Sequence, residues 1–441
     1  MKKYPVSIVR YEKPLESVRK AVSLCNGFEV IPTGARVFIK PNIVYWTRTT
    51  RFPKWGVITT SRVVQDTVRL LKDRGIDHIT IGEGTVLMDP ADRDSIAHAF
   101  ETLGFGVLKK RYAVRIVNIF ERPFRKVDLG HGVVLSFNCD ILDSDWVINL
   151  PVLKTHAQTI VSLGIKNLKG TIDLSSRKKC HSQKNGIDLH FRIAKLPDRM
   201  PPIFTLIDGI YTNERGPSFD GRIRRSNILI ASADILSADM VGARVLGYDP
   251  AVVPHLVHAA ENLNRRLDLS DIKLLGEPIE AVADYHDHSF PYNESNTLPA
   301  PMEKMGIKGL SYRKYDLTLC TYCSLLNGAV LSAIAKAWKD QPLNSVEVLT
   351  GKTMEPTAGM KYTILLGRCM YIKNKNHPNI NQMIAVKGCP PSPQAIISAF
   401  HQAGICIDGA ILKNLDLYPG TFMKRYENRP EFDESFFTIS G

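Results

Sequence analysis

An alternation of apolar strand patterns with amphipathic helix patterns constrains the fold of this chain most strongly. Residues 35–40 (ARVFIK) predict a buried strand that stops at Pro41. Residues 59–75 (TTSRVVQDTVRLLKDRG) predict a helix that begins at a Thr or Ser cap and ends at Gly75, and residues 78–84 (HITIGEG) predict the next strand. Strand, helix and strand in this order are typical of a right-handed βαβ unit in a largely parallel sheet.

The same alternation continues to about residue 250. Residues 145–156 (DWVINLPVLKTH) and 202–212 (PIFTLIDGIYT) read as strands, and residues 235–247 (ILSADMVGARVLG) read as a helix. Residues 268–301 lose this periodicity and are rich in Pro, Asn, Ser and His, which is typical of a linker.

A chain of 441 residues is longer than one hydrophobic core usually serves. We therefore predict an α/β protein with two domains. A largely parallel, doubly wound sheet domain spans residues 1–300, and a smaller α/β domain spans residues 301–441.

Apolar runs in the second domain end at cysteines. The runs are residues 315–320, 362–369 and 383–389, which end at Cys320, Cys369 and Cys389. Helical patterns follow the first and the third run. Because the carboxyl ends of neighbouring strands converge on one crevice in an open α/β sheet, we expect these three thiols to point into a common site. Cys323 adds a fourth thiol through a Cys-x-x-Cys spacing with Cys320.

Four thiolates are the ligand set of a [4Fe-4S] cluster, and we predict one such cluster at these four cysteines. The pattern leaves two alternatives open: a four-thiolate zinc site, and a redox-active Cys-x-x-Cys pair with two unrelated buried cysteines. The cluster is favoured over zinc because Cys369 and Cys389 stand far apart instead of forming a second Cys-x-x-Cys pair. Pro390, Pro391 and Pro393 stiffen the loop after Cys389, and a cysteine followed by proline recurs in cluster binding.

Two other groups of side chains are candidate ligands. Cys180, beside His181 in a polar stretch, is a candidate reactive thiol or additional ligand. His286 and His288 have the spacing of a metal pair, but their surroundings read as a flexible linker.

Polar side chains gather where the predicted strands of the first domain end. They are Lys40, Asn42, Gly82, Glu83, Gly84, Lys154, His156, Lys166, Asn167 and Lys169. Ammonium and amide donors suit phosphate or carboxylate, so these residues predict an anion or cofactor site. Lys154 and His156 are the catalytic candidates, since an imidazole can donate a proton near neutral pH. The alternative is that each lysine is a solvated charge and each glycine a tight turn.

The net charge of +13 favours an acidic partner. We do not expect nucleic acid, because the chain lacks a zinc finger, a helix-turn-helix pattern and an aromatic RNA-binding signature. No stretch approaches the roughly 18 apolar residues of a membrane span, and the first residues lack the apolar core of a signal peptide. We therefore expect a cytoplasmic protein without a membrane span.

A succession of motifs resembles the family catalogued as domain of unknown function 362, often labelled uncharacterised iron–sulfur centre proteins. The motifs are VFIKPNIV, TTSRVVQDTVRLLKDRG, ITIGEG, VINLPVLKTH, GIKNLKG, LIDGI and ASADILSADMVGARVLGYDP, within residues 37–250. Many members carry a ferredoxin-like module with two runs of closely spaced cysteines. This chain lacks a Cys-x-x-Cys-x-x-Cys run, so the resemblance implies one cluster here rather than two.

The loop GCPPSP (residues 388–393) resembles a ligand loop in the small subunits of complex I and of nickel–iron hydrogenases, which bind a four-iron cluster. This resemblance implies the type of ligation only.

From these features we expect an iron–sulfur oxidoreductase or electron-transfer protein that acts on an anionic small molecule or cofactor, with a redox partner protein. One alternative is a non-redox lyase or transferase whose cluster is structural or a Lewis acid. Another is an electron-carrier or maturation protein without its own substrate.

Overall fold

The computed structural model describes residues 3–86 and 92–439, and the chain divides into two compact units. The larger unit comprises Met1–Arg177, His190–Ser289 and Phe422–Gly441, and the smaller unit comprises Lys178–Leu189 and Phe290–Thr421. Three segments therefore lie outside the limits expected from the sequence. Lys178–Leu189 and residues 290–300 belong to the smaller unit, and the C-terminal tail, Phe422–Gly441, belongs to the larger one.

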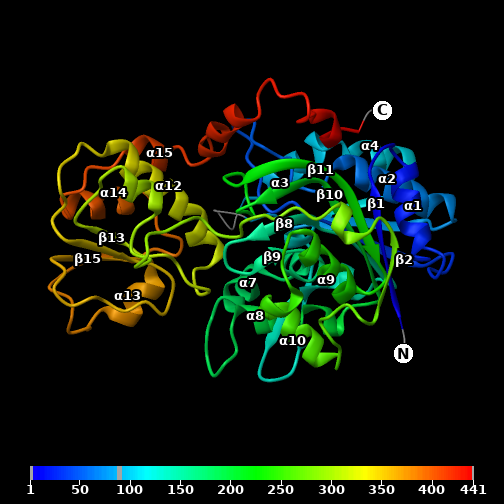
Figure 1. The fold of residues 1–441 in the computed structure, drawn as a ribbon, viewed down its shortest axis with the longest axis horizontal. Coiled ribbons are helices and arrows are strands. Elements are labelled where there is room, and N and C mark those ends of the chain that lie inside the picture. Colours follow the sequence, from blue (N-terminus) through cyan, green and yellow to red (C-terminus); the bar gives the residue numbers. More distant parts are fainter. Residues whose placement is uncertain (1–2, 87–91, 440–441) are drawn as a thin grey trace. The chain divides into compact units, whose positions relative to one another are not determined.

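A ten-stranded, largely parallel sheet forms the larger unit (Figure 1). Its main path is β12 (Ile272–Gly276), β1 (Tyr4–Arg10), β11 (Arg222–Ser232), β10 (Ile203–Glu214), β7 (Trp146–Leu150), β2 (Arg36–Pro41), β3 (His78–Glu83) and β4 (Arg115–Asn118). Along this path only β11 runs antiparallel to its neighbours, β1 and β10. The predicted α/β class is confirmed.

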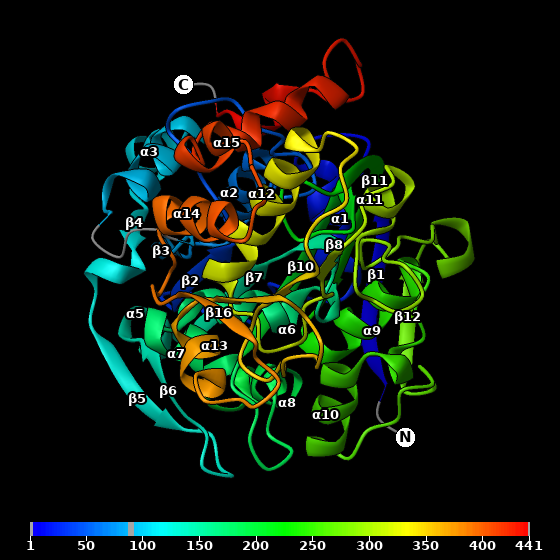
Figure 2. The same cartoon turned by 90° about the vertical axis from the view of Figure 1, so that its left-hand side faces the viewer.

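Helices cover both faces of this sheet (Figures 1 and 2). They include α1 (Glu16–Leu24), α2 (Ser61–Asp73), α3 (Asp94–Thr102) and α4 (Phe105–Tyr112) on one face, and α6 (Gly164–Asn167), α8 (Leu189–Ala194), α9 (Ile235–Val245) and α10 (Pro254–Asn262) on the other. The predicted helix at residues 59–75 is α2. The Thr60 side chain caps it by accepting the N–H of Val63, and Gly75 follows its end at φ +75°. A separate hairpin pairs β5 (Phe124–Asp128) with β6 (Val134–Asn138), and α5 (Cys139–Leu142) follows.

The single strand expected at residues 145–156 is two strands, because Pro151 lacks an N–H and interrupts the ladder. The first part is β7, and the second part is β8 (Val152–His156), which pairs with β9 (Ile160–Ser162) and with the second half of β10. This break carries Lys154 past the end of β7.

Four parallel strands form the sheet of the smaller unit, in the order β13 (Leu310–Tyr312), β14 (Val346–Leu349), β15 (Tyr362–Leu366) and β16 (Gln382–Val386). Its helices are α11 (Ala300–Lys304), α12 (Thr321–Ala337), α13 (Arg368–Asn374), α14 (Pro393–Gln402) and α15 (Gly409–Lys413). The predicted strands at 362–369 and 383–389 are confirmed as β15 and β16. The predicted strand at residues 315–320 is wrong. The Asp316 carboxylate accepts the N–H of Thr318 at 2.7 Å and holds a turn there, and Cys320 then occupies the N-cap position of α12.

The C-terminal tail packs its aromatic side chains on the larger unit. The Phe432 ring lies 5.4 Å from that of Trp55 and 4.7 Å from that of Tyr426, measured between centroids. The indole N–H of Trp55 donates to the carbonyl of Asp433 at 3.1 Å. Residues nearly four hundred positions apart thus share one aromatic cluster.

Candidate functional site

Four cysteines from separate segments of the smaller unit lie close together. Cys320 is the N-cap residue of α12 without a capping hydrogen bond from its side chain, and Cys323 lies in the first turn of that helix. Cys369 follows β15 and lies at the start of α13, and Cys389 follows β16. The other three thiols all act electrostatically on Cys323.

Two of these thiols share a hydrogen bond. The bond with Cys323 lowers the pKa of Cys320, and nearby Lys352 lowers it further; burial of Cys320 opposes both. The same bond, together with burial, raises the pKa of Cys323. Burial also raises the pKa of Cys369, which Lys352 opposes. The pair therefore favours a Cys320 thiolate that accepts a hydrogen bond from the Cys323 thiol.

Backbone bonds tie the loops of Cys369 and Cys389 together. The N–H of Gly367 donates to the carbonyl of Val386 at 2.8 Å, and that of Arg368 donates to the carbonyl of Gly388 at 3.0 Å. Gly367 has φ +101°, and a Cβ there would lie 3.8 Å from the sulfur of Cys323. This glycine therefore lies directly beside the thiols.

The proline-rich segment after Cys389 leads into α14. The peptide bond between Cys389 and Pro390 is cis. The Ser392 side chain caps α14 by accepting the N–H of Ala395, and Pro393 is its first residue. The first position of a helix needs no backbone N–H donor, so proline is well suited to start α14 there. Pro390 and Pro391 form the short link between Cys389 and this helix.

Two lysines flank the thiols. Lys178 Nζ lies 4.0 Å from the Cys389 sulfur, and Lys352 Nζ donates to the carbonyl of Lys178 at 3.1 Å. Lys352 follows the end of β14, so the carboxyl ends of β14, β15 and β16 all contribute to this site. Cys180 and His181 belong to the same segment as Lys178. Cys180 is fully buried, and His181 Nδ1 lies 3.0 Å from the carbonyl of Leu317.

The thiols are not arranged around the position of a single ion. Among residues 3–86 and 92–439, no three His, Cys, Asp or Glu side chains form a group that could hold one metal ion. A zinc ion about 2.3 Å from each of four thiolates would draw the sulfurs to about 3.8 Å from one another. A cluster has iron and sulfide between its ligands, so its cysteine sulfurs stand further apart.

A second polar site lies at the carboxyl ends of β2 and β3 in the larger unit. Lys40 Nζ lies 2.6 Å from a carboxylate oxygen of Glu83, with 0% and 3% of these side chains exposed. Glu83 also accepts the backbone N–H groups of Ile43 at 2.9 Å and Gly84 at 2.8 Å. Burial lowers the pKa of Lys40, and the Glu83 charge opposes this shift. The pair fixes two strand ends and the loops that follow them.

Lys154 extends the network from β8. Its Nζ donates to Asn42 Oδ1 at 2.7 Å and to the carbonyls of Val57 at 2.8 Å and Pro217 at 3.2 Å. Three acceptors match the three N–H donors of an ammonium group. Burial nevertheless lowers the pKa of Lys154 to about 7, with Glu83 opposing the shift. The residue therefore changes protonation near neutral pH.

A chain of amides completes the network. Asn42 donates to Asn167 Oδ1 at 2.9 Å, Asn167 donates to Asn149 Oδ1 at 2.8 Å, and Asn149 donates to the carbonyl of Gly164 at 3.0 Å. Asn149 was not among the predicted site residues, although it directly precedes Leu150 at the end of a buried strand. Lys40 and Lys154 thus both have acceptors within the protein, and the amides link them to the loop of α6.

The remaining predicted residues differ in exposure and in role. His156, Lys166 and Lys169 are half-buried. A Cβ at Gly82 would lie 2.3 Å from the Phe38 ring, and one at Gly84 would lie 2.6 Å from Ile119, so close packing explains both glycines.

The histidine pair His286 and His288 has structural partners. His286 is 1% exposed, with its Nε2 2.7 Å from the Thr212 hydroxyl and its Nδ1 2.8 Å from the carbonyl of Asp284. His288 Nδ1 lies 3.2 Å from the Tyr248 hydroxyl. The expectation of a flexible linker is wrong for His286, because its side chain is buried and both of its ring nitrogens have hydrogen-bond partners.

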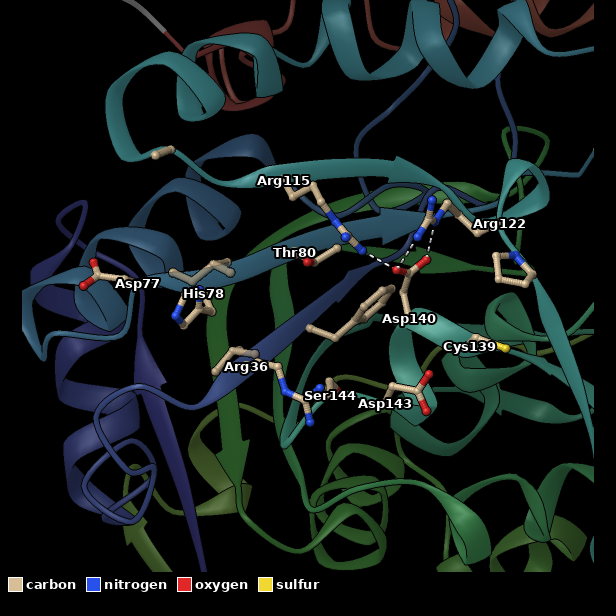
Figure 3. A pocket seen from close by; sticks show the side chains of 15 residues that line it. Arg36, Asp77, His78, Thr80, Arg115, Arg122, Cys139, Asp140, Asp143 and Ser144 are labelled. Carbon is tan, nitrogen blue, oxygen red and sulfur yellow. Dashed lines mark hydrogen bonds and ion pairs between the residues drawn. The ribbon is translucent and has the colours of Figure 1, made fainter.

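A pocket of about 430 Å³ lies at the opposite, amino-terminal ends of β2, β3 and β4 (Figure 3). Arg115 and Arg122 on its wall both pair with Asp140, and Arg36 pairs with Asp145. Its arginines are thus engaged with neighbouring carboxylates.

Comparisons with known proteins relate the chain to a family and to a cyanobacterial protein. Thylakoid-associated protein sll1697 of Synechocystis sp. is 27% identical over 274 residues, which cover 61% of this chain and 81% of that protein. In the part of the chain that the structure describes, no helix is long and apolar enough to cross a membrane. The family described as Domain of unknown function (DUF362) matches residues 37–244, the region that holds the Lys40–Glu83 pair and its network. Residues 37–244 of this chain therefore form a domain of the DUF362 family.

Proposed function

We propose that this chain is an iron–sulfur protein in which Cys320, Cys323, Cys369 and Cys389 hold one [4Fe-4S] cluster. The proposal includes electron transfer to or from an anionic small molecule or cofactor at the larger unit. The observation that carries it is the gathering of four thiols from three sequence segments of one small unit. Cysteines that merely fill a core would not require strand ends and a helix start to meet at their sulfurs.

The donor set suits a cluster in type, because four thiolates are its usual ligands. When bound, a [4Fe-4S] group supplies one-electron chemistry at a potential set by its surroundings. The thiolate-favouring environment of Cys320 and the positive charges of Lys178 and Lys352 stabilise anionic sulfur ligands.

The larger unit provides the proposed ligand site. Burying charged groups costs desolvation free energy, and networks of such groups are common at functional sites. The network of Lys40, Glu83 and Lys154 at the strand ends is therefore a candidate support for a binding surface. His156, Lys166 and Lys169, which are half-buried, are the donors proposed to meet the anion. Cytoplasmic location stays part of the proposal; thylakoid association is stated for the cyanobacterial relative.

Metal analysis of cysteine variants tests the cluster. Each of the four Cys→Ser variants is purified anaerobically, and iron, sulfide and zinc are measured. Cys406→Ser is the control, because Cys406 is an exposed free cysteine outside this group. Loss of iron and sulfide in the four variants, with full content in Cys406→Ser, is expected. Zinc in the wild-type chain, or iron unaffected by the four changes, would refute the assignment.

Phosphate binding tests the ligand site separately. We expect inorganic phosphate to raise the thermal unfolding midpoint of the wild-type chain, since a ligand at 100 times its Kd stabilises by about 2.7 kcal/mol. The Lys166→Ala/Lys169→Ala variant should lose this shift and keep its iron. Lys109→Ala, an exposed lysine on α4, is the control. Equal shifts in all three proteins would contradict a phosphate-like ligand at Lys166 and Lys169.

A further inference from the structure

The segment Lys178–Leu189 belongs to the smaller unit although its sequence neighbours on both sides belong to the larger one. Its first residues end α7 (Leu174–Cys180). Lys178 Nζ lies 4.0 Å from the Cys389 sulfur and 4.8 Å from the centroid of the Tyr322 ring, one residue before Cys323. The Lys178 side chain thus contacts two of the cysteine-bearing segments, the loop of Cys389 and the first turn of α12.

Lys352 binds the same segment through hydrogen bonds. Its Nζ donates to the carbonyl of Lys178 at 3.1 Å and to the Ser182 hydroxyl at 3.2 Å, and its backbone N–H donates to the Thr318 hydroxyl at 2.7 Å. Its charge also reaches the sulfurs of Cys320 and Cys369. The ammonium groups of Lys178 and Lys352 therefore both lie beside the thiols, and that of Lys352 is bonded to the backbone carbonyl of Lys178.

From this arrangement we infer that Lys178 is a positioning residue of the cysteine site, which donates to the Cys389 sulfur and raises the reduction potential of the bound cluster, with Lys352 holding it in place. This inference rests on the proposed function. A cluster with four thiolate ligands is anionic, and reduction adds one more negative charge. Hydrogen bonds to the sulfurs and nearby positive charge both favour the reduced form.

Redox titration of the reconstituted full-length chain tests this role. Lys178→Met keeps the length of the side chain and removes its charge, Lys178→Arg keeps the charge, and Lys179→Met removes the charge of the exposed next residue. We expect Lys178→Met to make reduction about tenfold less favourable, which is a fall of about 59 mV for one electron. Lys178→Arg should restore most of this difference, and Lys179→Met should leave the wild-type potential unchanged.

Iron and sulfide measured in the same samples separate the outcomes. A fully loaded Lys178→Met protein at the wild-type potential would overturn the inference and leave the proposed function intact. Loss of iron in both Lys178→Met and Lys178→Arg would also overturn it, by assigning Lys178 to folding or assembly. Loss of iron in Lys178→Met alone, with Lys178→Arg loaded at the wild-type potential, would support the need for charge. A wild-type chain without iron would refute the proposed function, and the inference with it.

Discussion

The Lys40 ammonium lies 2.6 Å from the Glu83 carboxylate where two adjacent parallel strands, β2 and β3, end, and both side chains are buried. A Cβ at Gly170 would lie 2.7 Å from Lys40 Nζ and 2.9 Å from a Glu83 oxygen, so the glycine lets the backbone close over the pair. Through Glu83 the pair also holds the backbone at Ile43 and Gly84. It is the structural centre of the polar network in the DUF362 domain.

Breaking this pair should destabilise the larger unit strongly. Lys40→Met leaves the Glu83 carboxylate buried without its counter-charge, and we expect a loss of about 3–5 kcal/mol in the free energy of unfolding. Urea titration followed by tryptophan fluorescence measures the loss, since three of the four tryptophans lie in this unit. Arg36 lies on the same strand as Lys40, β2, and forms an exposed pair with Asp145. The Arg36→Met variant breaks that pair and should lose no more than about 1 kcal/mol in the free energy of unfolding. Similar losses in the two variants would contradict a buried ion pair.

Lys154 should make stability depend on pH above neutrality. Its pKa is about 7 in the folded chain, against about 10.4 for an unperturbed lysine. Between these values the unfolded chain holds a proton that the folded chain has released, so the free energy of unfolding rises with pH. From pH 7 to pH 9 this residue should contribute an increase of roughly 2 kcal/mol.

The Lys154→Met variant isolates that contribution. Its free energy of unfolding should lack the increase between pH 7 and pH 9, whatever its absolute stability, while an exposed-lysine variant, Lys109→Met, should retain it. Parallel pH dependences in the wild-type chain and Lys154→Met would show that Lys154 keeps an ordinary pKa.

Gly367 should be needed at the cysteine site for the space that it leaves beside the Cys323 sulfur, and not only for its backbone conformation. Gly367→Ala places a methyl group beside the Cys323 sulfur at a φ of +101°, at a cost of about 1–3 kcal/mol. Gly359→Ala has comparable backbone strain at φ +85°, with nothing within 4 Å of its new methyl group. We expect reduced iron content only in Gly367→Ala. Equal iron content in the two variants would mean that the thiols do not depend on the shape of this loop.

The C-terminal tail should stabilise the larger unit. Phe432→Ala removes a buried ring that contacts Trp55 and Tyr426, and we expect it to lower the free energy of unfolding of that unit by about 3–5 kcal/mol. Phe290→Ala, at a ring that is 37% exposed, is the control and should change stability little. Proteolysis that removes the tail without affecting the unfolding of the larger unit would contradict this packing.

Local patterns predicted the parallel core of the DUF362 domain well. The elements β2, α2 and β3 follow directly from apolar periodicity, the Thr60 cap and Gly75, all of which are short-range signals. The same reasoning was wrong at residues 315–320. There Leu317 and Leu319 give a strand-like pattern, but a turn held by Asp316 decides the conformation. A short apolar run of this kind therefore does not distinguish a strand from a turn.

Long-range packing could not be predicted in this way. The contact of Phe432 with Trp55, and the membership of Lys178 in the smaller unit, depend on residues distant in sequence, for which periodicity carries no signal. The four cysteines were singled out because sulfur ligands are rare and chemically specific. The lysines beside them were not, because a lysine after a strand is usually a solvated charge.

The most direct test of the account is anaerobic purification followed by iron and sulfide analysis, with visible and electron paramagnetic resonance spectra before and after dithionite. We expect about four irons per chain, as a cubane bound by four cysteines requires. We also expect a broad visible absorption that bleaches as a paramagnetic signal develops. Zinc, or no metal, under strictly anaerobic conditions would contradict the central claim.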